Sequence, residues 1–316
     1  MKLTRSVFWI APMLALIPHL LLNEYYQYLV NLTLVYVLVG VGFNIVVGNL
    51  GQLAFSNVAF FGIGAYASGI LTTQLSMPWW MTIIPAGLAG ALAGCAASIP
   101  ALRGVRLFYL AIMTLAFGEL MRWSYIRTPS LTGGSMGLSV PAPELFGWVM
   151  EREHDKFYVF LFIVVVVVIF TNRILESRIG RAFQAIKNDE KAAAAMAIPT
   201  SRYFLLAFAL SGFIVGVGGA MYTALVGHLS PEAFDLVQLI QQFAIIMVGG
   251  LGSLVGSVLG AVLITATPEL FRDWPGFEEL MFGVVIVLVI LLLPRGLSSL
   301  LARAHSVFKD RYYRDD

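Results

Sequence analysis

Two side chains of opposite charge, Glu119 and Arg122, lie within an otherwise apolar stretch at 107–126. Their spacing of three residues places them on one helix face, where they can pair. Two central charges oppose membrane insertion by about 5–7 kcal/mol, whereas the Leu, Ile and Phe of the stretch favour it by about 2–5 kcal/mol. The sequence therefore predicts a helix inside a bundle, its charges facing protein or a water-filled path. A purely structural ion pair, or an Arg122 that reaches the headgroups, is the alternative to a pathway or gating role.

Residues for catalysis or metal binding are sparse. The histidines are scattered, Cys95 is the only cysteine, and the chain has no CxxC, HExxH, Gly-x-Ser-x-Gly or Walker A pattern. We therefore predict no enzymatic activity and no cofactor or metal held by this chain, so that any ATP would be used by a partner. A net charge of +2 is too small to indicate a nucleic-acid partner.

About thirty polar and Ala-rich residues at 173–202 interrupt the apolar sequence. Ile179, Phe183 and Ile186 have helical spacing and form one apolar stripe, with cations elsewhere on the turn. Such a helix can dock into a partner's cleft, burying Phe183 and Ile186 there. Alternatively, it can lie in the headgroups with its cations on anionic lipid.

A second short helix should follow within the same segment. Asn188 or Asp189 can cap it, acidic residues occupy its first turn, and Pro199 ends it. The segment thus predicts two short helices outside the membrane.

A short pattern, VGxLGxL, occurs at 47–53 and again at 248–254. A duplicated half, as many transporters have, and chance similarity in Gly- and Leu-rich sequence both account for it. Polar groups at such breaks can line a path, and Gln52, Ser56 and Asn57 follow the first one.

Glycines spaced four residues apart predict close packing between helices, with a pore-lining role as the alternative. They are Gly252, Gly256 and Gly260 on the 254–271 stretch, Gly90 with Gly94, and Gly212 with Gly216.

The loop at 127–156 contains Leu131-Thr-Gly-Gly-Ser-Met-Gly137 and Pro141-Ala-Pro143, which favour an ordered, turn-rich cap. A phosphate cradle there would need the Gly-Lys-Ser/Thr ending that this loop lacks.

These features must be positioned by membrane-spanning helices. With 59% hydrophobic residues, 12% charged residues and a mean hydropathy of +0.84, the chain predicts an all-α polytopic bundle with no separate soluble domain. The candidate spans are 7–22, 28–47, 54–75, 79–99, 107–126, 157–172, 203–226, 237–248, 254–271 and 280–293. Because 237–248 is short enough to be a half-helix or re-entrant piece, we expect eight to ten crossings.

Orientation follows from the distribution of Lys and Arg. With the amino terminus inside, the inner segments carry 15 of the 20 basic residues, so both termini and the 173–202 segment are predicted to be cytoplasmic and 127–156 external. A cleavable signal peptide is the alternative for the first stretch, but Pro12 and Pro18 suit a retained, kinked helix.

Several motifs together resemble one family. ESRIGRAFQAIKNDEKAAAAMAIP at 176–199 is similar to the cytoplasmic loop of branched-chain amino acid ABC importer permeases of the LivM type. GNLGQLAFSNVAFFGIGAYASGIL, TLAFGEL followed by LTGGSMGLSVP, and MVGGLGSLVGSVLGA resemble the same family, so the likeness runs from about residue 30 to 300.

The resemblance implies one transmembrane permease domain over 1–316 in the inner (plasma) membrane. It also implies a second, LivH-like permease, two cytoplasmic ATPase subunits and an external substrate-binding protein as partners. By the same likeness, the loop at 178–199 couples to the ATPases through Gly180, Arg181, Phe183, Ile186, Lys187, Asp189 and Glu190. The family more often has glycine where this chain has Ala197.

An aliphatic amino acid is the expected cargo, with urea or a short amide as the alternative. The competing hypothesis, from another class of transport protein, is a stand-alone channel or ion-coupled carrier.

Overall fold

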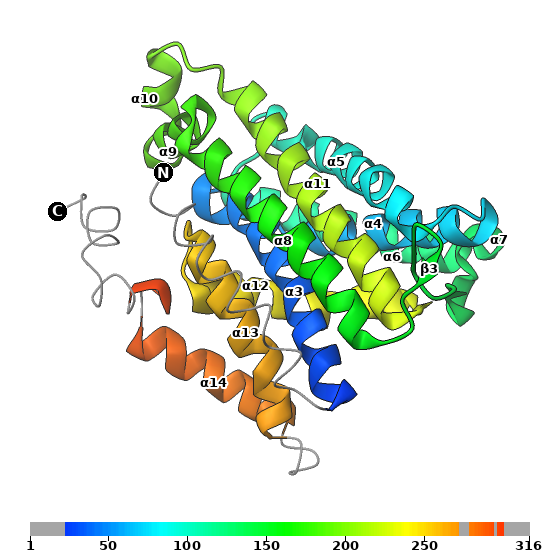
Figure 1. Cartoon of the computed structure of the whole chain (residues 1–316). Helices are drawn as coiled ribbons and strands as arrows, with labels where there is room; N and C mark the ends of the chain where they lie inside the picture. Colours follow the sequence, from blue (N-terminus) through cyan, green and yellow to red (C-terminus); the bar gives the residue numbers. More distant parts are fainter. Residues whose placement is uncertain (1–22, 272–277, 294–295, 300–316) are drawn as a thin grey trace.

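The computed structural model describes residues 23–271, 278–293 and 296–299 as a helical bundle (Figure 1). The predicted span at 7–22 and the basic carboxyl-terminal segment lie outside these residues. The long helices are α3 (Glu24–Asn44), α4 (Asn57–Gln74), α5 (Trp79–Leu102), α6 (Leu107–Arg127), α8 (Glu153–Glu176), α11 (Thr200–Val226), α12 (Leu236–Gly249), α13 (Leu254–Leu270) and α14 (Glu278–Leu292). Each occupies one of the apolar stretches identified in the sequence, so the predicted helical bundle is confirmed.

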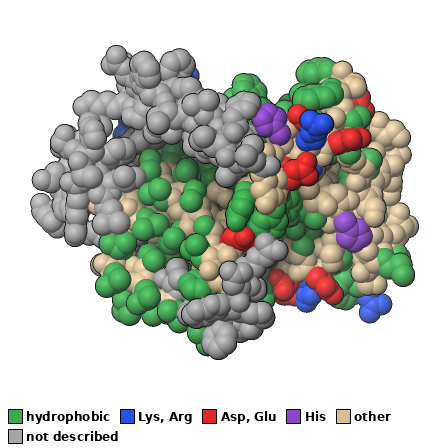
Figure 2. Space-filling view, turned by 60° about the horizontal axis from the view of Figure 1, so that its bottom comes forward, with side chains coloured by type: hydrophobic (Ala, Val, Ile, Leu, Met, Phe, Trp, Pro, Cys, Tyr) green, Lys and Arg blue, Asp and Glu red, His purple; other side chains and the backbone are tan. Residues whose placement is uncertain are grey.

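Four helical segments in the described part of the chain are long and apolar enough to cross a membrane: Glu24–Asn49, which is α3 with the π-turn η1 (Ile45–Asn49), then α5, α8 and α11. The outside of the bundle is apolar as well. Leu92 of α5, Phe162 of α8 and Leu291 of α14 are each about 70% exposed. Figure 2 shows hydrophobic side chains covering one side of the described surface, with charged side chains gathered on the other. This surface suits a hydrocarbon solvent.

Glycines allow α11 to pack closely at the centre of the bundle, against α3, α4 and α5. A methyl group on Gly90 of α5 would overlap the carbonyl oxygen of Gly212 on α11, and a methyl group on Gly212 would overlap that of Gly90. Gly94 faces the Phe208 carbonyl in the same way, and a Cβ on Gly216 would lie 2.6 Å from the Ala86 oxygen. The two glycine pairs that the sequence shows separately therefore pack against each other.

The connecting segments gather at two opposite ends (Figure 1). One end, the α9/α10 end, holds residues 50–56, 103–106 and 250–253 with the short helices α9 (Arg178–Asn188) and α10 (Glu190–Ala195). The other, the cap end, holds 128–152 and 227–235. There α7 (Pro129–Thr132), η2 (Gly134–Met136) and η3 (Pro231–Phe234) accompany two small antiparallel sheets.

The cap is ordered by pairing between distant segments, as the turn-rich sequence predicts. Strand β1 (Leu138–Ser139) pairs with β4 (His228–Leu229), which follows α11 directly. Strands β2 (Glu144–Leu145) and β3 (Trp148–Val149) form a hairpin whose two turn residues both have positive φ.

Helix α12 begins in the middle of the bundle. The side-chain amide of Gln238 in its first turn donates to the Tyr36 hydroxyl at 3.2 Å, and Tyr36 lies midway along α3. Phe234, just before α12, packs on Tyr66 in the middle of α4. With 14 residues, α12 is about 21 Å long, short of the roughly 30 Å hydrocarbon core. It is therefore a half-helix, one of the two alternatives that the sequence left open.

Candidate coupling surface and helix breaks

Side-chain caps define the two short helices of the 173–202 segment. Ser177 accepts a hydrogen bond from the Ile179 amide at 3.1 Å and begins α9. Asp189 ends α9 and caps α10, its Oδ1 accepting from the amides of Lys191 and Ala192 at 2.8 and 3.0 Å. Of the two residues that could cap the second helix, Asp189 does so. The predicted pair of helices outside the long spans is confirmed.

The apolar stripe of α9 faces the chain's own bundle. Phe183 is fully buried and Ile186 is 2% exposed; the Phe183 ring meets that of Tyr203 on α11 edge to face, 6.2 Å between centroids. The expectation that Phe183 and Ile186 insert into a partner's cleft is therefore wrong for this structure. An amphipathic period shows that a face will be buried, and here α8 and α11 supply the apolar surface that buries it.

The exposed surface of α9 and α10 combines charged side chains with small ones. Arg181, Lys187 and Asp189 are exposed, with Met196 at 79%, and α10 adds the exposed Ala192, Ala194 and Ala195. Gly180, by contrast, is buried, and a methyl group there would overlap the Leu175 backbone at the end of α8. Gly180 thus allows the tight turn from α8 into α9 and does not form part of the exposed surface.

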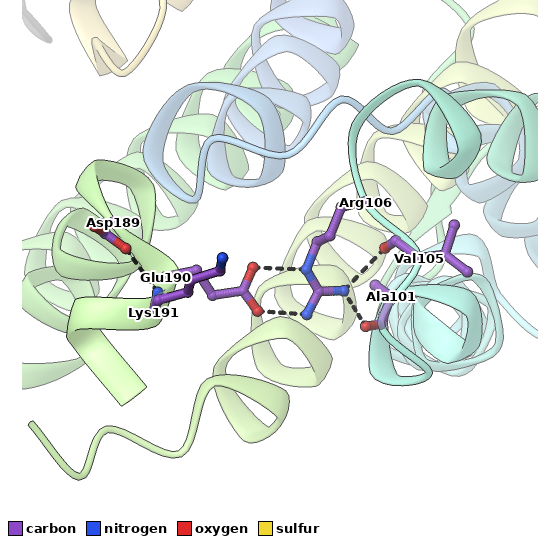
Figure 3. Close-up of polar contacts among 6 residues, drawn as sticks. All are labelled: Ala101, Val105, Arg106, Asp189, Glu190 and Lys191. Atoms are coloured by element: carbon purple, nitrogen blue, oxygen red, sulfur yellow. Dashed lines mark hydrogen bonds and ion pairs between the residues drawn. The ribbon is translucent and has the colours of Figure 1, made fainter. Parts of the chain in front are cut away.

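Glu190 is held by an arginine that the sequence did not single out (Figure 3). Arg106, between α5 and α6, donates from Nε and Nη2 to the two oxygens of Glu190 at 2.7 and 2.5 Å. Its Nη1 donates to the carbonyls of Ala101 and Val105, and its guanidinium lies 4.3 Å over the Phe204 ring. This bidentate pair joins α10 to the α5–α6 turn across 84 residues of sequence, a separation at which no local spacing rule applies.

We expect this pair to couple more strongly than the other Arg–Glu pair. In a double-mutant cycle with Arg106→Gln and Glu190→Gln, the coupling energy should be about 1–2 kcal/mol, because the fork is bidentate and stacked on an aromatic ring. The control cycle, Arg122→Gln with Glu119→Gln, should give at most about 0.5 kcal/mol, typical of an exposed pair one turn apart. Thermal stability of the purified protein measures both, and equal couplings would contradict this interpretation.

The first VGxLGxL segment is a helix break. After η1 the chain runs without regular structure through residues 50–56, and the Phe55 amide donates to the Thr114 hydroxyl of α6 at 2.7 Å. Gly51 has φ +77, and a Cβ there would lie 2.7 Å from Cγ of Lys187 on α9. The break is therefore in direct contact with the α9 helix.

The second VGxLGxL segment is the turn from α12 into α13, and it touches the first. Gly252, which corresponds to Gly51 in the pattern, also has a left-handed backbone, φ +83. Asn44 joins the two: its Oδ1 accepts from the Gly252 amide at 2.7 Å, and its Nδ2 donates to the Ser253 carbonyl and the Ser257 hydroxyl at 3.0 and 2.9 Å. Backbone groups that a helix break leaves without helical partners need such substitutes where they are buried.

The polar residues after the first break are buried. Gln52, Ser56 and Asn57 are 8%, 1% and 1% exposed, and Asn57 Nδ2 donates to Gln242 Oε1 of α12 at 2.8 Å. Gln52 Oε1, Asn57 Oδ1 and Gln242 Nε2 have no hydrogen-bond partner among the described residues. These side chains face the packed interior in this conformation rather than an open path.

The Glu119–Arg122 pair forms, with Arg122 Nε and Nη2 donating to Glu119 Oε2 at 3.0 and 2.9 Å. Its predicted place inside the bundle is wrong for this chain, because the two side chains are 45% and 34% exposed. Helix α6 contacts mainly α4 and α5 and exposes large residues such as Trp123. Two charges in a membrane-spanning helix need a polar neighbour, but that neighbour can belong to another chain.

The three glycines near 254–271 divide between a turn and a helix. Gly252 precedes α13, in the left-handed turn, and so is not on the helix face with the others. A Cβ on Gly256 would lie 2.5 Å from the Gly249 carbonyl oxygen of α12, and one on Gly260 would overlap that of Ile245.

The helices are interrupted by breaks and pack through glycines, the exterior of the bundle is apolar, and a helical surface with charged residues lies at one end. Together these features define a helical integral membrane permease. A model of the family described as permease component of branched-chain amino acid transport systems matches residues 25–294, and this chain belongs to that family. The high-affinity branched-chain amino acid permease proteins LivM of Salmonella typhimurium and of Escherichia coli are each 34% identical to it, over 84% of this chain and 68% of theirs. LivH of Escherichia coli is 24% identical over 85% of this chain and 92% of that protein. No solved structure matches.

Proposed function

We propose that this chain is one permease subunit of an ATP-powered importer of branched-chain amino acids. The observation that carries the proposal is the exposed surface of α9 and α10, fixed to the bundle by the Phe183 packing and the Arg106–Glu190 pair. Lys187 in that surface lies against the first helix break and near the second. A displacement of α9 would therefore move residues at both breaks.

The remaining parts of the importer follow from chemistry and from the relatives. The chain has no nucleotide-binding motif, so two ATPase subunits supply the energy from the cytoplasm at the α9/α10 end. Similarity to both LivM and LivH supports pairing with a second, homologous permease. An external binding protein delivers cargo at the cap end. The chain lies in the inner membrane with both termini cytoplasmic, as the basic residues favour.

The flat, Ala-rich side of α10 should be sensitive to added bulk. In Ala195→Arg, a long cation occupies the face on which the ATPase packs, and we expect at least a tenfold loss of ATPase copurification together with loss of leucine uptake. Ala195 is exposed, so the permease itself should remain monodisperse.

Ala142→Arg is the matched control, because Ala142 is an exposed alanine of the cap. It should leave ATPase copurification unchanged. Equal retention of the ATPase by both variants would refute docking at α10. Leucine flux through the purified chain alone, without ATP, would instead support a stand-alone channel or carrier.

A further inference from the structure

The half-helix α12 leaves an unfilled space toward the cap end. Between α3 and α13 lies a pocket of about 410 Å³, which reaches from Tyr25 and Glu269 at the start of α3 to Tyr36 and Gln241 at mid-depth. Because α12 begins only at Leu236, no helix of the described chain fills the outer half of this space. The volume falls in the range of small-molecule sites, about 300–1,000 Å³.

The pocket wall combines apolar surface with one carboxylate. Leu29 and Leu32 of α3 face Ile264 and Pro268 of α13 across it. Glu269 lies near its outer end and accepts a hydrogen bond from the Tyr25 hydroxyl at 2.6 Å, which orients the carboxylate. A ligand in this pocket would meet a negative charge beside aliphatic side chains.

A buried hydroxyl in the pocket wall has no hydrogen-bond partner in the described part of the chain. Thr265 is 8% exposed, and its Oγ1 makes no hydrogen bond among the described residues. Buried polar atoms in proteins are rarely left unpaired, so a ligand acceptor would account for it. Thr265 and Glu269 are four residues apart on α13, with Cβ atoms about 5–6 Å apart, a span that one small zwitterion can bridge.

We propose that this pocket receives an α-amino acid with an aliphatic side chain on its way through the permease. Its ammonium group binds Glu269, its carboxylate accepts from the Thr265 hydroxyl and the Gln241 amide, and its side chain lies on Leu29, Leu32 and Ile264. The assignment rests on the proposed import function and adds the place where this subunit holds the cargo.

Thiol protection in the reconstituted importer tests the site without requiring transport. Thr265→Cys in a Cys95→Ala background should react with a small thiol reagent from the cap side. Saturating L-leucine should slow the reaction at least tenfold. 4-Methylpentanoate, which has the same side chain and carboxylate as leucine but lacks the ammonium group, should not slow the reaction. Adding Glu269→Gln should abolish protection by leucine. A cysteine that fails to react, or equal protection by both compounds, would overturn the assignment.

Uptake of L-leucine by proteoliposomes containing the whole importer separates this inference from the proposed function. Glu269→Gln and Thr265→Val should each raise KM at least tenfold, whereas Glu232→Gln, an exposed carboxylate of the same end, should leave it unchanged. If the unmodified importer takes up leucine and all three variants match it, the pocket assignment alone fails. If the unmodified importer takes up no leucine, the proposed function fails.

Discussion

Replacement of Gly90 by valine should prevent α5 from packing on α11 and strongly destabilise the protein. The Gly90 and Gly212 Cα atoms each face the other helix's carbonyl oxygen, so the added atoms meet backbone, which cannot rotate away. Overpacking in a rigid core costs about 1–3 kcal/mol and occasionally more. At a backbone crossing of two central helices we expect at least about 3 kcal/mol.

The temperature at which the monodisperse peak disappears in mild detergent measures this loss. Gly283→Val is the matched control, since Gly283 lies in α14 and an added Cβ would meet no atom of the described residues within 4 Å. Its stability should change little. If Gly90→Val and Gly283→Val behaved alike, the close α5–α11 crossing would not be a main determinant of stability.

Asn44→Leu should uncouple the two helix breaks and abolish uptake. Leucine has the same branched shape as asparagine. However, it can neither accept a hydrogen bond from the Gly252 amide nor donate one to the Ser253 carbonyl and the Ser257 hydroxyl. Each buried group left unpaired costs about 1–3 kcal/mol, so we expect a loss on the order of 3 kcal/mol or more. Two of the three groups belong to the backbone of a tight turn, where other partners are out of reach.

Graded variants separate this network from packing. Ser257→Ala removes one partner only and should cost about 1 kcal/mol, with uptake partly retained. Asn188→Leu, an exposed asparagine at the end of α9, should leave thermal stability unchanged. Normal uptake by Asn44→Leu would contradict the idea that the two breaks must stay joined.

Much of the architecture is local and therefore readable from the sequence. An apolar stretch of about 20 residues becomes a helix in lipid whatever its neighbours, because its backbone groups have no other hydrogen-bond partners. The ends of α9 and α10 follow from Ser177 and Asp189, which cap within a few residues. Glycine periodicity likewise shows that some helix will pack closely.

Contacts between residues far apart in the chain could not be predicted from the sequence. Arg106 could be recognised only as one basic residue at the same end as Glu190, and Asn44 and Gln242 only as polar residues in apolar stretches. No spacing rule relates positions 84 or 208 residues apart. The exposed Met196 follows the alanines of α10, but nothing in the sequence shows that it remains uncovered.

The sequence by itself determined the membrane-embedded helical class, the helices and the two polar segments, because hydrophobic burial and backbone hydrogen bonding act over a few residues at a time. Only the tertiary structure decided that Phe183 and Ile186 face the chain's own bundle, that α6 carries its ion pair on the outside, and that Asn44 ties both breaks together. Each of these outcomes depends on whether an apolar or a polar surface packs against the helix in question. The period of a single helix carries no information about its neighbour.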